Sequence, residues 1–143
     1  IEVMKTLWCD DVSSYQGKYF SIDAAYQNPK PVQKPHIPIL FGGESDPALL
    51  RVAQVGQGWY GFNLTPQLLL EERLGYLAGL LDAQGRSIEE IRICVGPASS
   101  VRSAADFERF QSLGVDQVVL PVMAAKISSL EERAKKAFAR VYG

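Results

Sequence analysis

Four residues stand where an apolar run gives way to an amphipathic one: Gly42, Gly43, Glu44 and Ser45. Glycines let the backbone approach a bulky anion without a Cβ in the way. A helix that begins here directs its free N–H groups and its positive dipole end at the same spot, and Ser45 adds a hydroxyl. The pattern is typical of a phosphate site, with the Glu44 side chain directed away and its N–H directed in. A tight turn at the glycines and a helix N-cap at Ser45 or Asp46 explain the same residues, because neither GxGxxG nor GxxxxGK[ST] is present.

Other chemistry-bearing residues are weaker candidates, and no catalytic residue can be named. His36 is the only histidine and lies in a proline-rich segment, where we expect a solvated side chain. Asn63, at the end of a predicted strand, is a candidate for the substrate side. We expect Trp59, Tyr60 and Phe62 to be core residues and not a cofactor stack. The paired carboxylates, which we expect on solvated helix faces, are Glu71–Glu72, Glu89–Glu90 and Glu131–Glu132.

Four strand–helix units must position these residues. Predicted strands cover residues 37–41, 59–63, 91–95 and 115–122, and an amphipathic segment follows each. Continuous apolar strands that alternate with helices indicate a parallel sheet covered by helices. The pattern leaves open whether the sheet is a doubly wound one or part of a (β/α)₈ barrel. A barrel needs roughly 250 residues, so this chain would hold about half of one.

Capping signals predict where the helices begin. Thr65–Pro66 resembles an N-cap followed by a proline in the first turn, and Leu70, Leu74, Leu77 and Leu81 form the apolar stripe of that helix. Reciprocal caps are expected at three further positions, namely Ser87 with Glu90, Ser103 with Asp106, and Ser128 with Glu131.

Composition restricts the function classes. The 143 residues are 47% hydrophobic and carry a formal net charge of -1, without the basic excess of a nucleic-acid surface. No apolar run is long enough to span a membrane. The two cysteines, Cys9 and Cys94, belong to no CxxC pair, so we expect neither a zinc site nor a disulfide framework and assign the chain to the cytoplasm.

The first 36 residues differ from the rest. Residues 1–8 have the spacing of the end of a helix, and 9–36 is predicted as an ordered insertion loop, in which prolines exclude helix. Residues 37–143 then form a single domain of four βα units. Because the chain begins within a helical pattern, we expect it to be a fragment of a longer protein.

The motifs "SYQGKYFSI" and "PKPVQKPHIPILFGGESDPALLRVAQVGQGWYGFN" resemble the luciferase-like monooxygenase superfamily, and "GFNLTP" and "LGVDQVVLPV" follow in the family's order. The resemblance implies a (β/α)₈ barrel that uses FMN or coenzyme F-420, with this chain as strands five to eight. It implies that Ser45 and the backbone N–H groups of Gly43 and Glu44 bind the cofactor phosphate, as part of a site at Gly42–Ser45. The "YGFNLTP" segment is more similar to the F-420-using branch.

The implied activity is hydride transfer between the cofactor and a small organic substrate. The family's first four strands, which supply much of the ring pocket and the acid–base groups, are not in this chain. The half-barrel alone is therefore expected to be inactive, and its exposed edges require cover, for example in a homodimer. The alternative is a non-catalytic half-barrel that binds a phosphorylated ligand or dimerises.

Overall fold

The computed structural model describes residues 1–101 and 103–142. The chain divides into two compact units, Ile1–Pro38 and Ile39–Gly143, which are described separately.

The first unit contains one helix and one hairpin. Helix α1 (Glu2–Cys9) is followed by strands β1 (Ser13–Gln16) and β2 (Ser21–Ala25), which pair antiparallel. The loop after β2 returns to α1, where Lys30 Nζ donates to the Leu7 carbonyl at 2.8 Å and also to that of Asp10. The prediction of a loop over 9–36 missed this hairpin, because its strands are short, polar and without apolar alternation.

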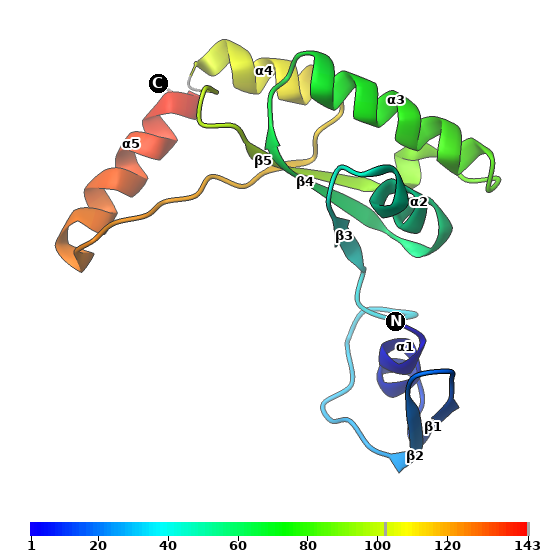
Figure 1. The fold of residues 1–143 in the computed structure, drawn as a ribbon. Coiled ribbons are helices and arrows are strands. Elements are labelled where there is room, and N and C mark those ends of the chain that lie inside the picture. The colour runs from blue at the N-terminus through cyan, green and yellow to red at the C-terminus, as the bar shows by residue number, and fades with distance from the viewer. Residues whose placement is uncertain (102, 143) are drawn as a thin grey trace. The chain divides into compact units, whose positions relative to one another are not determined.

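The second unit is built on a parallel sheet in the order β3-β4-β5-β6 (Figure 1). Each pair of neighbouring strands is parallel, which confirms the α/β prediction. The strands are β3 (Leu40–Gly42), β4 (Gly58–Leu64), β5 (Arg92–Pro97) and β6 (Gln117–Val118). The helices are α2 (Asp46–Val55), α3 (Leu68–Asp82), α4 (Ala104–Ser112) and α5 (Leu130–Tyr142), with 3-10 turns η1 (Ile88–Glu90) and η2 (Ile127–Ser129).

The hydrophobic core lies between one face of the sheet and the helices. Trp59 and Val95 are fully buried, and they belong to the same cluster as Val52 of α2 and Leu77 of α3. Because side chains alternate across a strand, Tyr60, Phe62 and Gly96 lie on the opposite face. The stripe predicted for α3 is confirmed, with Leu70, Leu77 and Leu81 fully buried and Leu74 packed against the cluster.

Two of the predicted capping boxes form, whereas the predicted starts of two other helices differ from those in the structure. Ser87 with Glu90, and Ser103 with Asp106, make the reciprocal bonds. Helix α3 starts after Gln67, because β4 continues to Leu64 and Pro66 is buried, so Thr65–Pro66 forms the connection. Ser128 lies inside η2, whose N-cap is Lys126, so the predicted Ser128 cap of the last helix is wrong.

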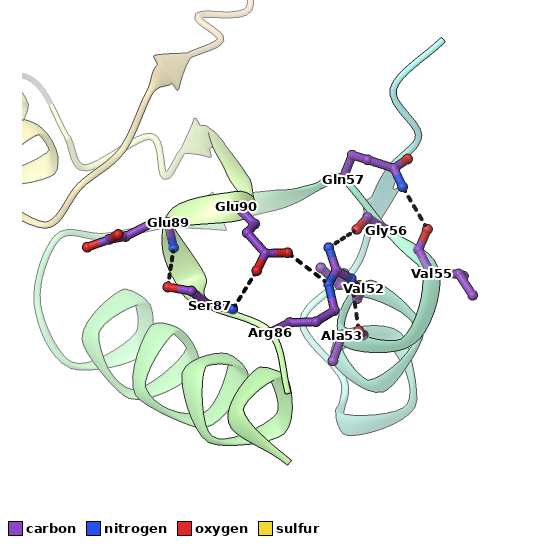
Figure 2. Close-up of polar contacts among 9 residues, drawn as sticks. All are labelled: Val52, Ala53, Val55, Gly56, Gln57, Arg86, Ser87, Glu89 and Glu90. Carbon is purple, nitrogen blue, oxygen red and sulfur yellow. Dashed lines mark hydrogen bonds and ion pairs between the residues drawn. The ribbon is translucent and has the colours of Figure 1, made fainter. Parts of the chain in front are cut away.

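Arg86 joins α2 to the turn before β5 (Figure 2). Its guanidinium donates to the carbonyls of Ala53 and Gly56, each at 2.9 Å, and more distantly to that of Val52 at 3.4 Å. Its Nε also pairs with the Glu90 carboxylate at 3.2 Å. Since the last carbonyls of a helix have no partner within the helix, Arg86 acts as a side-chain cap for the end of α2.

Candidate functional site: the β3–α2 corner

The corner between β3 and α2 turns at Gly43, whose φ is +106°. Residues with a Cβ rarely adopt this conformation, and a Cβ here would also lie 3.2 Å from that of Ala48. At Gly42 a Cβ would meet only the Tyr60 carbonyl oxygen, at an ordinary 3.8 Å. The corner therefore requires a glycine at position 43 and not at position 42.

Strand β4 holds this corner from both sides of Gly43. The Gly43 N–H donates to the Tyr60 carbonyl at 3.3 Å, and the Trp59 indole N–H donates to the Gly43 carbonyl at 2.8 Å. The Glu44 carboxylate accepts from the Phe62 N–H at 2.6 Å. The Glu44 side chain is thus directed to β4, and the backbone N–H of Glu44 remains available at the corner.

Ser45 is the N-cap of α2 and is exposed. Its carbonyl accepts from the N–H groups of Ala48 and Leu49, at 2.9 and 3.0 Å, but its hydroxyl makes no capping bond. Within the described residues, the N–H groups of Glu44 and Ser45 face no acceptor. Two backbone donors, one hydroxyl and the positive end of a helix dipole therefore meet at this corner, and this set suits a phosphate group.

Besides the Glu44 carboxylate, a second negative charge lies next to the corner, and this one forms an ion pair. Asp46, the first residue of α2, contacts Arg73 of α3 at 2.7 Å, and Arg73 also pairs with Glu72 at 2.7 Å. The hydrogen bond to Asp46, followed by that to Glu72, raises the pKa of the Arg73 guanidinium. The pairing directs the Asp46 carboxylate to α3, so the predicted alternative of an Asp46 N-cap does not occur.

The aromatic residues of β4 separate into two groups. Trp59 is fully buried, as predicted for a core residue, whereas Phe62 is 62% exposed, which contradicts that prediction. The reason is that the helices that contribute to the hydrophobic core pack on the face of the sheet that carries Trp59, whereas Phe62 lies on the other face. Tyr60 is half-buried on the same face as Phe62. Asn63 is exposed at the end of β4, with a φ of +59°, where the register with β5 shifts.

Sequence reasoning missed Gly96, at the end of β5. A Cβ at this position would lie 2.7 Å from the Tyr60 hydroxyl oxygen and 3.0 Å from a ring carbon of Phe62. Both rings therefore lie against bare backbone. The signal available in the sequence is weak: a glycine that follows an apolar strand, which turn formation explains equally well.

The remaining candidates carry no arrangement for catalysis. His36 belongs to the first unit, where its ring lies 6.1 Å from that of Trp8 and its Nδ1 lies 2.8 Å from the Ile37 carbonyl oxygen. The paired carboxylates lie outside the sheet, and several make ion pairs on helix surfaces, as predicted: Glu71 with Arg109, Glu131 with Lys135 and Glu132 with Lys136. In the described ranges, no helix is both long and apolar enough to cross a bilayer.

Solved structures, curated relatives and a family model were each compared with this chain, and their results agree. Solved structures with the same fold include an F420-dependent secondary alcohol dehydrogenase (13% identity, TM-score 0.72) and the coenzyme F420-dependent tetrahydromethanopterin reductase of Methanopyrus kandleri (14%, TM-score 0.74). These matches cover 98% and 99% of this chain, and 59% and 60% of theirs. Both are TIM-barrel enzymes.

Curated relatives are matched over part of their length. An uncharacterised protein of Mycobacterium tuberculosis is 29% identical over 83% of this chain and 40% of its own. Pyrimidine monooxygenase RutA of Allorhizobium ampelinum is 34% identical over 39% of this chain and 15% of its own. The chain thus spans two fifths or less of these relatives. The model of the luciferase-like monooxygenase family matches residues 1–140, and the chain therefore belongs to that family.

Proposed function

We propose that this chain is the part of a flavin- or deazaflavin-dependent oxidoreductase that binds the phosphate end of the cofactor, FMN or coenzyme F-420. In this proposal its four strands are strands five to eight of a (β/α)₈ barrel. Family membership supports an oxidoreductase, and two solved structures that share the fold are F420-dependent enzymes by title. The bound cofactor would supply hydride-transfer chemistry toward a small organic substrate.

The observation that carries the proposal is the set of donors at the β3–α2 corner that have no acceptor. Ser45 would donate its hydroxyl, and Glu44 and Ser45 would donate their backbone N–H groups, to phosphate oxygens. The three bonds to β4 hold these donors in place before any ligand arrives. The exposed Asn63 would line the substrate side at the neighbouring strand end.

Titration of the protein expressed from its complete gene tests the proposal. The probes are FMN and F-420, and the matched variants are Ser45→Ala and Ser112→Ala. Ser112 is a surface serine whose hydroxyl bonds within α4. Because a hydrogen bond to a charged group is worth about 1.5–3 kcal/mol, Ser45→Ala should weaken binding by roughly 10- to 100-fold. Ser112→Ala should leave the affinity unchanged.

Equal affinities for both variants would refute the phosphate contact. Binding of inorganic phosphate at this corner without binding of FMN or F-420 would instead favour the alternative, a non-catalytic half-barrel for a phosphorylated ligand. A dimer that forms without any of these ligands would favour the other form of this alternative, a non-catalytic half-barrel that dimerises.

A further inference from the structure

Arg73 of α3 contacts the first residue of α2, next to the β3–α2 corner. The two helices pack against each other (Figure 1). One guanidinium nitrogen of Arg73 lies 2.7 Å from the Asp46 carboxylate, and the other lies 2.7 Å from that of Glu72. The guanidinium also lies over the Tyr76 ring, 5.6 Å from its centroid. The Arg73 side chain is only 21% exposed, whereas that of Asp46 is 64% exposed. Two carboxylates and a ring therefore hold this guanidinium in place.

The charges around the corner are mostly negative. Glu44 and Asp46 are the two neighbours of Ser45 in the sequence, and Glu72 shares Arg73 with Asp46. Among the ion pairs of the described residues, only those of Arg73 involve any of these three carboxylates. A phosphate at the corner would therefore lie beside Asp46, and Arg73 is the cation that pairs with this carboxylate.

Without Arg73, the Asp46 carboxylate would oppose a phosphate in two ways. Its negative charge would repel the anion. It would also compete for the same donors, because acidic side chains in the first turn of a helix accept from free N–H groups. The backbone N–H groups of Glu44, Ser45 and Asp46 have no acceptor within the described residues, and Pro47 has no N–H. An unpaired Asp46 carboxylate would thus lie next to vacant donors.

We propose that Arg73 is a positioning residue for the phosphate site, a step that rests on the proposed function. Arg73 holds the Asp46 carboxylate toward α3 and neutralises its charge. The donors at the start of α2 therefore stay open to the phosphate of the ligand. In this role Arg73 acts through Asp46 and does not itself contact the ligand.

The test titrates FMN and F-420 by fluorescence into the protein expressed from its complete gene. The variants are Arg73→Met, Arg73→Lys, Asp46→Asn and the double variant Arg73→Met/Asp46→Asn. Arg109→Met is the matched control, because Arg109 of α4 also forms an ion pair with a carboxylate of α3, that of Glu71. Arg73→Met should weaken binding by about 2- to 5-fold, the effect of one charge at a helix N-terminus. Arg73→Lys and Arg109→Met should leave the affinity nearly unchanged.

Asp46→Asn distinguishes this electrostatic role from a structural one. If Arg73 acts through the charge of Asp46, both Asp46→Asn and the double variant should bind the probe at least as tightly as the unmodified protein. If the ion pair only holds α3 against α2, Asp46→Asn should weaken binding as Arg73→Met does, and the double variant should not recover. Circular dichroism checks that each variant folds.

Salt gives an independent measurement of the same effect. The affinity difference between Arg73→Met and the unmodified protein should shrink when NaCl is raised from about 0.05 M to about 0.5 M, because salt screens the charge of Asp46. A difference that stays constant with salt would overturn the electrostatic role.

The role of Arg73 and the phosphate contact fail separately. If Ser45→Ala weakens binding but Arg73→Met binds as tightly as Arg109→Met, the phosphate contact stands and the role of Arg73 is refuted. If Ser45→Ala has no effect but Arg73→Met weakens binding and Asp46→Asn restores it, the Ser45 contact is refuted and the role of Arg73 stands. If neither FMN nor F-420 binds the unmodified protein, both are overturned.

Discussion

Replacing Arg86 by methionine removes the side-chain cap of α2 while it keeps most of the side-chain volume. The lost bonds are those to the Ala53 and Gly56 carbonyls at 2.9 Å, with a weaker one to Val52 at 3.4 Å. The Arg86 side chain is 22% exposed, so water can reach the freed carbonyls in part. We therefore discount the usual contribution of a bond to a charged group, about 1.5–3 kcal/mol, to about 1–1.5 kcal/mol for each of the two short bonds. The expected loss of unfolding free energy is about 2–3 kcal/mol.

Urea unfolding followed by far-ultraviolet circular dichroism measures this loss by linear extrapolation. Arg51→Met is the matched control, because Arg51 is an exposed arginine of α2 itself, and surface changes of this kind stay within about 0.5 kcal/mol. Arg86→Lys should give an intermediate loss, since a single ammonium group cannot span carbonyls as the guanidinium fork does. If Arg86→Met and Arg51→Met lose the same unfolding free energy, the cap contributes nothing and the reasoning is refuted.

Two further predictions concern the corner and the turn before β5. Gly43→Ala should lower the unfolding free energy by about 1–3 kcal/mol, because alanine is strained at a φ of +106°. Gly42→Ala, the control, should change the unfolding free energy little. Equal losses for the two variants in urea unfolding would contradict the geometry of the corner. Glu90 has a pKa below its ordinary value, first through the Ser87 N–H and then through Arg86. Because the pKa of Glu90 is lower in the folded state, its ionised carboxylate stabilises the fold. This stabilisation is complete above the ordinary pKa of a glutamate and is lost as the pH falls through the lowered pKa of the folded state. In urea unfolding, the free energy of unfolding should therefore decline less steeply from neutral to acid pH for Glu90→Gln than for Glu89→Gln. Parallel declines for the two variants would contradict a stabilising role of the Glu90 carboxylate.

What could be predicted from the sequence was largely local. The capping boxes at Ser87 and Ser103 depend on residues three positions apart, and the leucine stripe of α3 depends on helical spacing, so both could be recognised without a partner. The parallel sheet followed from the alternation of apolar strands with helices. The hairpin at 13–25 has no such pattern and was missed.

The predictions that failed depend on contacts distant in sequence. Trp59 and Phe62 are both aromatic residues of one strand, and only the position of the helices decides that one is buried and the other is 62% exposed. Similarly, Pro66 fits the first turn of a helix by local rules, but its burial against the core takes it out of α3. Composition and spacing carry no information on which face the helices cover.

Strand β4 links the fold to the proposed phosphate contact. Its Tyr60 carbonyl, Trp59 indole and Phe62 N–H hold the β3–α2 corner. Because the corner is held by bonds that the protein already makes, a ligand need not order it, and binding avoids that entropic cost.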